Sequence, residues 1–202
     1  MNETALKHLL RADKTLARVI KKIGPCPIAP RRGVTPFQAL VKSVTYQQLN
    51  GTAAETIFRR LLALFPDRKF PTPESIVAAS DEKLRSAGLS RAKTAAIKDI
   101  AAKTISGVVP TRRAIARMSD AEIIERLTTI RGVGPWTVEM LLMFTLGRPD
   151  VLPSTDYGVR CGFAKVYGLK TLPSPKEILA HGECWRPYRS VASWYFWRAL
   201  DL

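Results

Sequence analysis

Apolar residues recur along most of the chain at the spacing of three and four residues that is typical of amphipathic helices. One such helix is expected to begin at Thr35-Pro36, with an apolar face made of Phe37, Leu40, Val41 and Val44. Short β-branched runs such as VVP (108–110) are too brief to build a sheet. The pattern therefore predicts an all-α protein.

Signals for helix ends support this prediction. Capping boxes, in which a hydroxyl residue is followed three positions later by Glu, are expected at Thr52 with Glu55, Ser119 with Glu122 and Ser174 with Glu177. A cap followed by proline at the first helical position is found at Thr72-Pro73 and Ser174-Pro175. Helices are expected to end just before Gly88, Gly107 and Gly147.

Two stretches rich in proline and glycine interrupt the helical pattern: GPCPIAPRRGVTP (24–36) and GRPDVLPSTD (147–156). The first separates one N-terminal helix from the rest of the chain. We expect a central helical lobe over about residues 37–148, and a second lobe made of residues 1–36 and 149–202. A cleft is expected between the two lobes.

A tight turn, Ile130-Arg131-Gly132-Val133-Gly134, joins helices expected at about 120–128 and 135–146. Its glycines allow close backbone approach, and the next helix N-terminus offers N–H groups to a phosphate. The turn could equally be an ordinary helical hairpin inside a core.

The net charge bears on that choice. Lys and Arg number 32 against 17 Asp and Glu, which gives a formal charge of +15 and favours a polyanionic partner. A ribosomal or simply basic protein would share this charge, whereas 46% hydrophobic residues argue against a disordered basic tail. We therefore interpret the turn as a clamp on the DNA backbone that does not read sequence.

Histidines and cysteines give little sign of metal chemistry. His8 and His181 lie in no ligand-spaced cluster, which argues against a zinc site. Cys26, Cys161 and Cys184 are expected to be reduced, buried thiols of a cytosolic protein. No stretch is long and apolar enough to span a membrane, and the N-terminus lacks the pattern of a secretory signal.

A family resemblance then becomes apparent. LTTIRGVGPWTVEMLLMF (127–144) followed by RPDVLPSTDYGVRCGF (148–163) resembles the helix-hairpin-helix and Gly/Pro-rich loop with aspartate (HhH-GPD) of the base-excision DNA glycosylases. Within that superfamily, the chain is most similar to the AlkA-type DNA-3-methyladenine glycosylases II. YQQLNGTAAETIFRRLL (46–62), GLSRAKTAAIKDIA (88–101) and WRPYRSVASWYFW (185–197) extend the resemblance from about Phe37 to Trp197.

The resemblance implies that Asp156 is the catalytic carboxylate of a single catalytic unit spanning residues 1–202, with the helix-hairpin-helix at 120–146. From the residues alone, Asp156 could merely cap the helix that it precedes, as Asp150 could be an ordinary loop acid. The implied activity is that of a monofunctional glycosylase. It would flip out alkylated purines and hydrolyse their N-glycosidic bond, leaving an abasic site.

The resemblance also implies a base pocket. Trp136 stands where bifunctional relatives have a lysine, so the amine needed for lyase chemistry is missing and a stacking surface is gained. Trp136 could also be a core anchor. Trp197, Tyr157 and Met140 complete the expected pocket, with Met140 where AlkA-type enzymes often have a tyrosine. Trp194 and Phe196 are expected in the core.

DNA contacts are implied for two loops. Leu49, with Gln48, matches the wedge that fills the gap left by a flipped nucleotide, although composition alone would make it a core leucine. The phosphate-binding hairpin would use Arg131, Gly132, Val133, Gly134 and Thr137. Backbone carbonyls of Thr128, Ile130 and Val133 could hold a monovalent cation, Na⁺ or K⁺.

Further expectations concern cofactors and partners. An iron–sulfur cluster needs four closely spaced cysteines, so none is expected. The partner would be double-stranded DNA with 3-methyladenine, 7-methylguanine or 1,N6-ethenoadenine, bound by a monomer without membrane attachment. It would act in a prokaryotic cytoplasm or nucleoid, or in a eukaryotic nucleus. The alternatives are a non-catalytic helix-hairpin-helix DNA-binding module and a bifunctional glycosylase/lyase.

Overall fold

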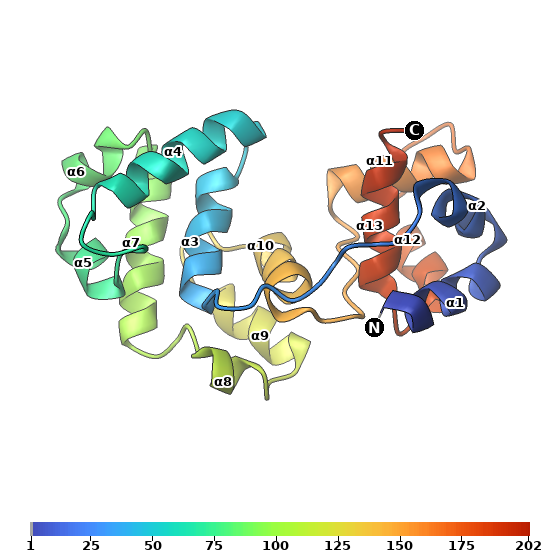
Figure 1. The fold of residues 1–202 in the computed structure, drawn as a ribbon, viewed down its shortest axis with the longest axis horizontal. Helices are drawn as coiled ribbons and strands as arrows, with labels where there is room; N and C mark the ends of the chain where they lie inside the picture. Colours follow the sequence, from blue (N-terminus) through green and yellow to red (C-terminus); the bar gives the residue numbers. More distant parts are fainter. Residues whose placement is uncertain (1) are drawn as a thin grey trace. The chain divides into compact units, whose positions relative to one another are not determined.

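The computed structural model describes residues 2–202, and Met1 of the predicted second lobe lies outside them. Helices account for all regular structure in this range and no strand occurs there, which confirms the all-α prediction (Figure 1). The described chain forms two compact units. We call Arg32–Leu141 the central unit, and the residues up to Arg31 together with Leu142–Leu202 the terminal unit.

Helix α7 (Arg91–Ile105) forms the middle of the central unit, where α3 (Pro36–Tyr46) and α5 (Pro73–Ala78) pack against it (Figure 1). Its buried positions Ile97 and Ile100 are fully excluded from solvent. The other helices of this unit are α4 (Gly51–Ala63), α6 (Asp81–Ser86), α8 (Arg112–Ile115), α9 (Asp120–Leu127) and α10 (Pro135–Met140).

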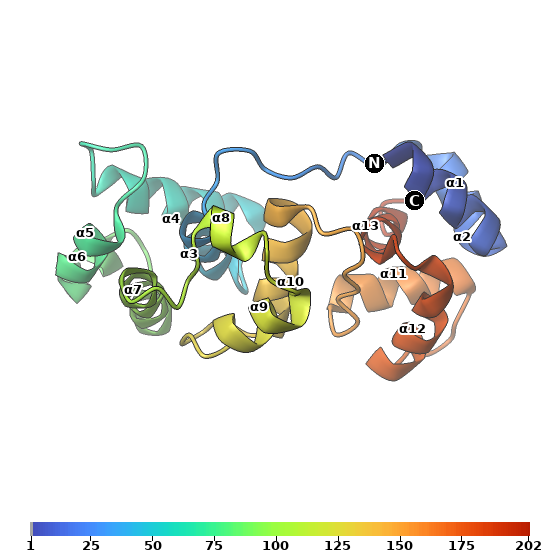
Figure 2. The same ribbon diagram turned by 90° about the horizontal axis from the view of Figure 1, so that it is seen from below.

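Helix α13 (Arg189–Ala199) forms the middle of the terminal unit, where it packs against α11 (Tyr157–Tyr167) and α2 (Lys14–Ile23) (Figure 2). A glycine permits the closest approach, because a Cβ on Gly162 of α11 would lie 2.0 Å from the Phe196 carbonyl oxygen. Trp185, Tyr195 and Phe196 are fully buried in this core. The remaining elements are α1 (Asn2–Ala12), α12 (Pro175–His181), the π-helical turn η1 (Leu141–Leu146) and the 3₁₀ turn η2 (Gly182–Trp185).

Two helices differ from the prediction. The expected single N-terminal helix is wrong: it is divided into α1 and α2 at Asp13, whose carboxylate caps α2 by accepting from the amides of Thr15 (3.0 Å) and Leu16 (2.9 Å). The helix expected over 135–146 is α-helical only to Met140 and continues as η1. The helix expected at about 120–128 is confirmed as α9.

Most predicted helix ends are confirmed. Capping boxes form at Ser119 with Glu122 and at Ser174 with Glu177. The box expected at Thr52 with Glu55 is wrong, because α4 begins two residues earlier than a cap at Thr52 would place it, and Asn50 caps the helix by accepting from the Ala53 amide (2.9 Å). The three glycines expected after helices all have positive φ, at Gly88, Gly107 and Gly147.

The prediction of buried thiols is wrong for two cysteines. Cys26 is buried, but Cys161 of α11 is half-buried and Cys184 is exposed. In the η2 turn, the buried side chain is that of the next residue, Trp185. No disulfide joins any of these cysteines in the described chain. Across residues 2–202, no helix is long and apolar enough to cross a bilayer.

Candidate active site and DNA interface

Asp156 is the N-cap of α11 and is half-buried. Its Oδ1 accepts two hydrogen bonds, one from the Val159 amide (2.7 Å) and one from the indole Nε1 of Trp197 (2.7 Å). The expectation that Asp156 begins a helix is therefore confirmed. Capping accounts for the bond from Val159. The bond from an indole on another helix is not part of a cap, and it fixes the orientation of the carboxylate.

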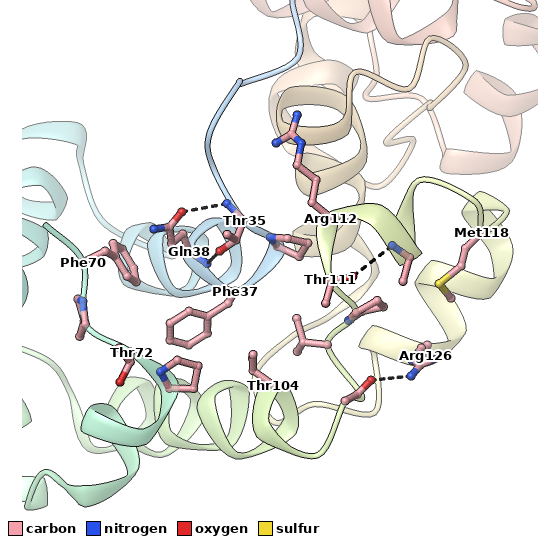
Figure 3. A pocket seen from close by; sticks show the side chains of 17 residues that line it. Thr35, Phe37, Gln38, Phe70, Thr72, Thr104, Thr111, Arg112, Met118 and Arg126 are labelled. Carbon is pink, nitrogen blue, oxygen red and sulfur yellow. Dashed lines mark hydrogen bonds between the residues drawn. The ribbon is translucent and has the colours of Figure 1, made fainter. Parts of the chain in front are cut away.

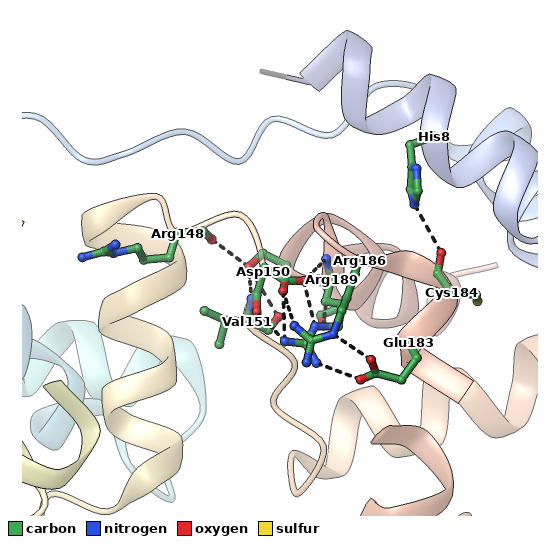
Figure 4. Close-up of polar contacts among 10 residues, drawn as sticks. His8, Arg148, Asp150, Val151, Glu183, Cys184, Arg186 and Arg189 are labelled. Atoms are coloured by element: carbon green, nitrogen blue, oxygen red, sulfur yellow. Dashed lines mark hydrogen bonds and ion pairs between the residues drawn. The ribbon is translucent and has the colours of Figure 1, made fainter. Parts of the chain in front are cut away.

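The loop that leads to Asp156 is attached to α13 at its beginning as well (Figure 4). Arg189 of α13 donates from Nε to Asp150 Oδ1 (2.7 Å). The next residue, Ser190, donates from Oγ to the Arg148 carbonyl (2.7 Å) and accepts from the Val151 amide (2.9 Å). Both ends of the loop are thus held by one helix, which positions Asp156 relative to Trp197.

Each carboxylate oxygen of Asp150 is paired with an arginine. Besides Arg189, Arg186 donates from Nη1 to Asp150 Oδ2 (2.7 Å), and Arg186 is also paired with Glu183 (2.8 Å) (Figure 4). These pairs occupy both carboxylate oxygens of Asp150 with guanidinium groups. Asp150 therefore holds the loop in place, as expected for an ordinary loop acid without a catalytic role.

Trp197 lies half-buried in the terminal unit, with its ring tilted against Phe144 at 5.8 Å between centroids. It also lies directly over Gly158, where a Cβ would approach its Cδ1 to 2.8 Å. Tyr157 is 72% exposed, and a hydrogen bond with Cys161 raises its pKa. Of the residues expected in the core, Phe196 is fully buried, and Trp194 is half-buried and packs against the core of the terminal unit.

The other two residues of the expected pocket belong to the central unit. Trp136 lies in the first turn of α10 and is 37% exposed, and Met140 is half-buried at the end of that helix. Trp136 is thus not enclosed in a core. The grouping of Trp136 and Met140 with Trp197 and Tyr157 in one pocket stays a prediction.

The hairpin turn, residues 130–134, is anchored to α7. The Arg131 amide donates to Asp99 Oδ2 (2.8 Å), and a Cβ on Gly132, whose φ is +73°, would lie 2.8 Å from the Ala96 Cβ. Gly134 differs, because its φ is −91° and a Cβ there would meet open space. Arg131, Gly132 and Gly134 are exposed, whereas Val133 and Thr137 are buried.

Residues 47–50, which we call the wedge loop, join α3 to α4. Gln48 adopts a left-handed conformation (φ 55°), which is uncommon for a residue other than glycine. Gln48, Leu49 and Asn50 are exposed, and Leu49 is 39% accessible. Leu49 is therefore not a core leucine, and its exposure is compatible with the wedge role expected for it.

Sequence reasoning missed the side chains that hold these segments. Gln47, within the wedge loop, donates to the hairpin turn, and Lys93 of α7 donates to backbone carbonyls at the end of α3 and in the wedge loop. Arg189 and Ser190 hold the loop before Asp156. All four lie inside segments that carry the family resemblance. No local signal marks them, because each partner lies tens of residues away along the chain.

One large hollow of the central unit contains none of the expected site residues (Figure 3). It measures about 800 Å³ and is lined mainly by apolar side chains. Arg112 and Arg126 at its edge donate to backbone carbonyls of Val34 (2.7 Å) and Gly107 (2.6 Å). Both guanidinium groups thus contribute to holding local backbone.

Asp13 forms a hydrogen-bond centre in the terminal unit. Its Oδ2 accepts from Trp185 Nε1 (2.9 Å), lies 3.2 Å from His181 Nε2 and also accepts from the Tyr167 hydroxyl. Cys184 lies close enough to complete a three-ligand group with Asp13 and His181. Because Oδ2 already accepts hydrogen bonds from side chains, the arrangement fits a structural role for Asp13 better than a metal site.

Comparison with known proteins completes this description. Residues 41–187 match the model of the HhH-GPD superfamily base excision DNA repair proteins. The chain belongs to this superfamily. It is 39% identical over 198 residues to DNA-3-methyladenine glycosylase 1 of Schizosaccharomyces pombe, covering 96% of this chain and 86% of that relative. These matches confirm the family expected from the sequence.

Solved structures give the same result for the fold. The Schizosaccharomyces pombe 3-methyladenine DNA glycosylase Mag1, in complex with abasic DNA, superposes with a TM-score of 0.90 at 39% identity, covering 98% of this chain and 97% of that chain. A DNA-3-methyladenine glycosidase from Bacillus halodurans gives 0.85 at 35% identity, covering 96% and 88%. The HhH-GPD glycosylase fold is thereby confirmed.

Proposed function

We propose that this protein is a monofunctional DNA glycosylase that flips alkylated purines out of double-stranded DNA and hydrolyses their N-glycosidic bond. DNA-3-methyladenine glycosylase activity in base excision repair follows from its family and from relatives such as the Schizosaccharomyces pombe enzyme. One observation carries the mechanistic part. Asp156 has a carboxylate whose Oδ1 is fixed by two donors at 2.7 Å.

An oriented carboxylate suits hydrolysis of an alkylated purine nucleoside. Alkylation of a ring nitrogen places positive charge on the base, so the base leaves with little help from a general acid. The sugar then develops the positive charge of an oxocarbenium ion. Asp156 would stabilise that charge and position or deprotonate the attacking water. The proposed substrates are 3-methyladenine and 7-methylguanine, with 1,N6-ethenoadenine as a neutral substrate.

The remaining site residues would act on the flipped nucleotide and on the duplex. Trp136 and Trp197 would stack on a cationic base, with each contact contributing about 0.5–2 kcal/mol. Flipping is required because the glycosidic bond cannot be reached inside the stack, and Leu49 with Gln48 would fill the resulting gap. Because Trp136 offers no amine, the proposed product is an abasic site in an unbroken strand.

The hairpin turn would bind DNA phosphates without reading sequence. Its exposed glycines and the N-terminus of α10 support this role, although the Arg131 amide already donates to Asp99. Carbonyls of Thr128, Ile130 and Val133 would hold a monovalent cation. The Ile130 carbonyl accepts from the Val133 amide (3.1 Å), and its second lone pair is compatible with a cation ligand.

Asp156→Asn tests the catalytic assignment. The asparagine Oδ1 can still accept from Val159 and Trp197, so folding and DNA affinity should be preserved. A charge about 4 Å from the developing cation contributes about 4 kcal/mol at an effective dielectric constant of about 20, so base release should fall about a thousand-fold. Single-turnover excision at the wild-type rate would refute the assignment. If the wild-type protein binds abasic DNA but releases no base, the alternative function, a non-catalytic helix-hairpin-helix DNA-binding module, would be supported instead.

A further inference from the structure

The wedge loop has little internal support. Its backbone hydrogen bonds to α3 are long, at 3.4 Å from the Gln47 amide to Val44 O and 3.4 Å from the Leu49 amide to Tyr46 O. Gln48 adds a left-handed backbone conformation, which costs free energy in a residue with a Cβ. A loop of this kind keeps one conformation only if contacts from elsewhere hold it.

The first of these contacts is the side-chain amide of Gln47. Its Nε2 donates to the carbonyl of Gly132 (3.1 Å) and to the hydroxyl of Thr137 (3.0 Å). Gly132 lies in the hairpin turn, and Thr137 is a buried residue in the first turn of α10. One amide therefore links the wedge loop to both halves of the segment that we propose to contact phosphates.

The second contact is Lys93 of α7. Its ammonium donates to the carbonyls of Thr45 and Gln47, both at 2.8 Å, where α3 ends and its last carbonyls lack helical partners. Burial lowers the pKa of Lys93. Ala96 and Asp99, which contact the hairpin turn, follow at intervals of three residues on the same helix. One face of α7 thus supports both DNA-facing segments.

We propose that Gln47 and Lys93 are positioning residues that couple the hairpin turn to the wedge loop. Phosphate contact at the turn would thereby hold Leu49 in the place from which it replaces the extruded nucleotide. This inference rests on the proposed function. It concerns extrusion of the base and not cleavage of the glycosidic bond.

This division predicts which substrates are affected. Gln47→Ala removes both side-chain bonds to the hairpin, and Gln47→Glu keeps the size while replacing the donor. Each should slow single-turnover excision from a fully paired duplex about ten-fold, the effect of losing one to two hydrogen bonds. Excision of the same lesion opposite a one-nucleotide gap, where extrusion meets less resistance, should approach the wild-type rate. The affinity of Gln47→Ala for undamaged duplex should change less than two-fold, because this variant adds no charge beside the hairpin.

Lys93→Met should share this selective defect. Its matched control is Lys98→Met, which removes the same charge from α7 but lies at an exposed pair with Asp81 (2.5 Å). The control should excise both substrates at the wild-type rate. Thermal unfolding of each variant separates a loss of positioning from a loss of fold, since a partly unfolded protein would lose activity on both substrates equally.

A double-mutant cycle gives the decisive result. If Gln47 acts through the wedge, the defects of Gln47→Ala and Leu49→Ala on the paired duplex should be strongly non-additive, with the double variant no slower than Leu49→Ala. Additive defects, or equal losses on paired and gapped substrates, would overturn the coupling while leaving the glycosylase assignment intact. Absence of excision by the wild-type protein on both substrates would instead refute the proposed function.

Discussion

Replacing Trp197 by phenylalanine separates two roles that one side chain combines. The family resemblance predicts that the Trp197 indole stacks on the flipped base, and the structure adds that its Nε1 donates to Asp156 at 2.7 Å. Trp197→Phe removes the donor and keeps an aromatic face. Trp197→Leu removes both, so the leucine variant alone cannot tell stacking from carboxylate positioning.

The expected sizes of the two effects differ. A hydrogen bond to a charged group contributes about 1.5–3 kcal/mol, and because both partners are half-buried the lower part of this range applies. Its loss should slow excision about ten-fold for every lesion, since the proposed mechanism uses Asp156 for all substrates. A cation–π contact contributes about 0.5–2 kcal/mol, or about two- to thirty-fold, and only a cationic lesion uses it.

The assay is single-turnover excision of 7-methylguanine, which is cationic, and of 1,N6-ethenoadenine, which is neutral. Trp197→Phe should slow both by a similar factor, and Trp197→Leu should slow 7-methylguanine further. Trp194→Phe, on the same helix and also half-buried, is the matched control and should leave both rates unchanged. Wild-type rates for Trp197→Phe on both lesions would refute the positioning role, and equal losses in the two variants would refute the cation–π contact.

Gly134→Asp, at a position with open space for a side chain, should weaken binding to damaged and undamaged duplex alike by about ten-fold, measured by fluorescence anisotropy. Wild-type affinity of this variant would mean that the hairpin is a core turn without DNA contacts. Borohydride should trap no covalent complex with lesion DNA; a trapped band on a denaturing gel would reveal an amine nucleophile. Asp13→Asn should lower the free energy of unfolding at pH 7 by about 1–3 kcal/mol, measured in urea. Burial raises the pKa of Asp13, but hydrogen bonds from Tyr167, the Leu16 amide, Trp185 and His181 outweigh it, so the pKa is lowered. Wild-type stability should therefore decline below about pH 4, as Asp13 is protonated, and the variant should lose less; parallel declines would contradict this.

Features that depend on a few neighbouring residues could be predicted from the sequence. The capping boxes at Ser119 and Ser174 are complete within four positions, so their pattern contains the whole interaction. Thr52 with Glu55 has the same spacing but forms no capping box, because Asn50 is the better cap and α4 begins two residues earlier than expected. Local patterns thus give the existence of a helix more surely than its first residue.

Contacts between distant segments could not be predicted. Gln47 and Thr137 are separated by 90 positions, and Asp156 and Trp197 by 41, so neither pair leaves a local pattern. The resemblance gave Asp156 and Trp197 separate roles, on the sugar and on the base, and the bond between them emerges only when α11 and α13 pack. The π-helical turn Leu141–Leu146 also lacks a signal, since no proline or glycine interrupts it.

The most direct test of the account is the product formed from methylated duplex DNA. Wild-type protein should release free 3-methyladenine or 7-methylguanine, identified by chromatography and mass spectrometry, while the strand stays unbroken in neutral buffer and breaks only after alkali. The Asp156→Asn protein should bind the same DNA and release about a thousand-fold less base. No base released by the wild type, equal release by both proteins, or enzyme-dependent nicking in neutral buffer would contradict the account.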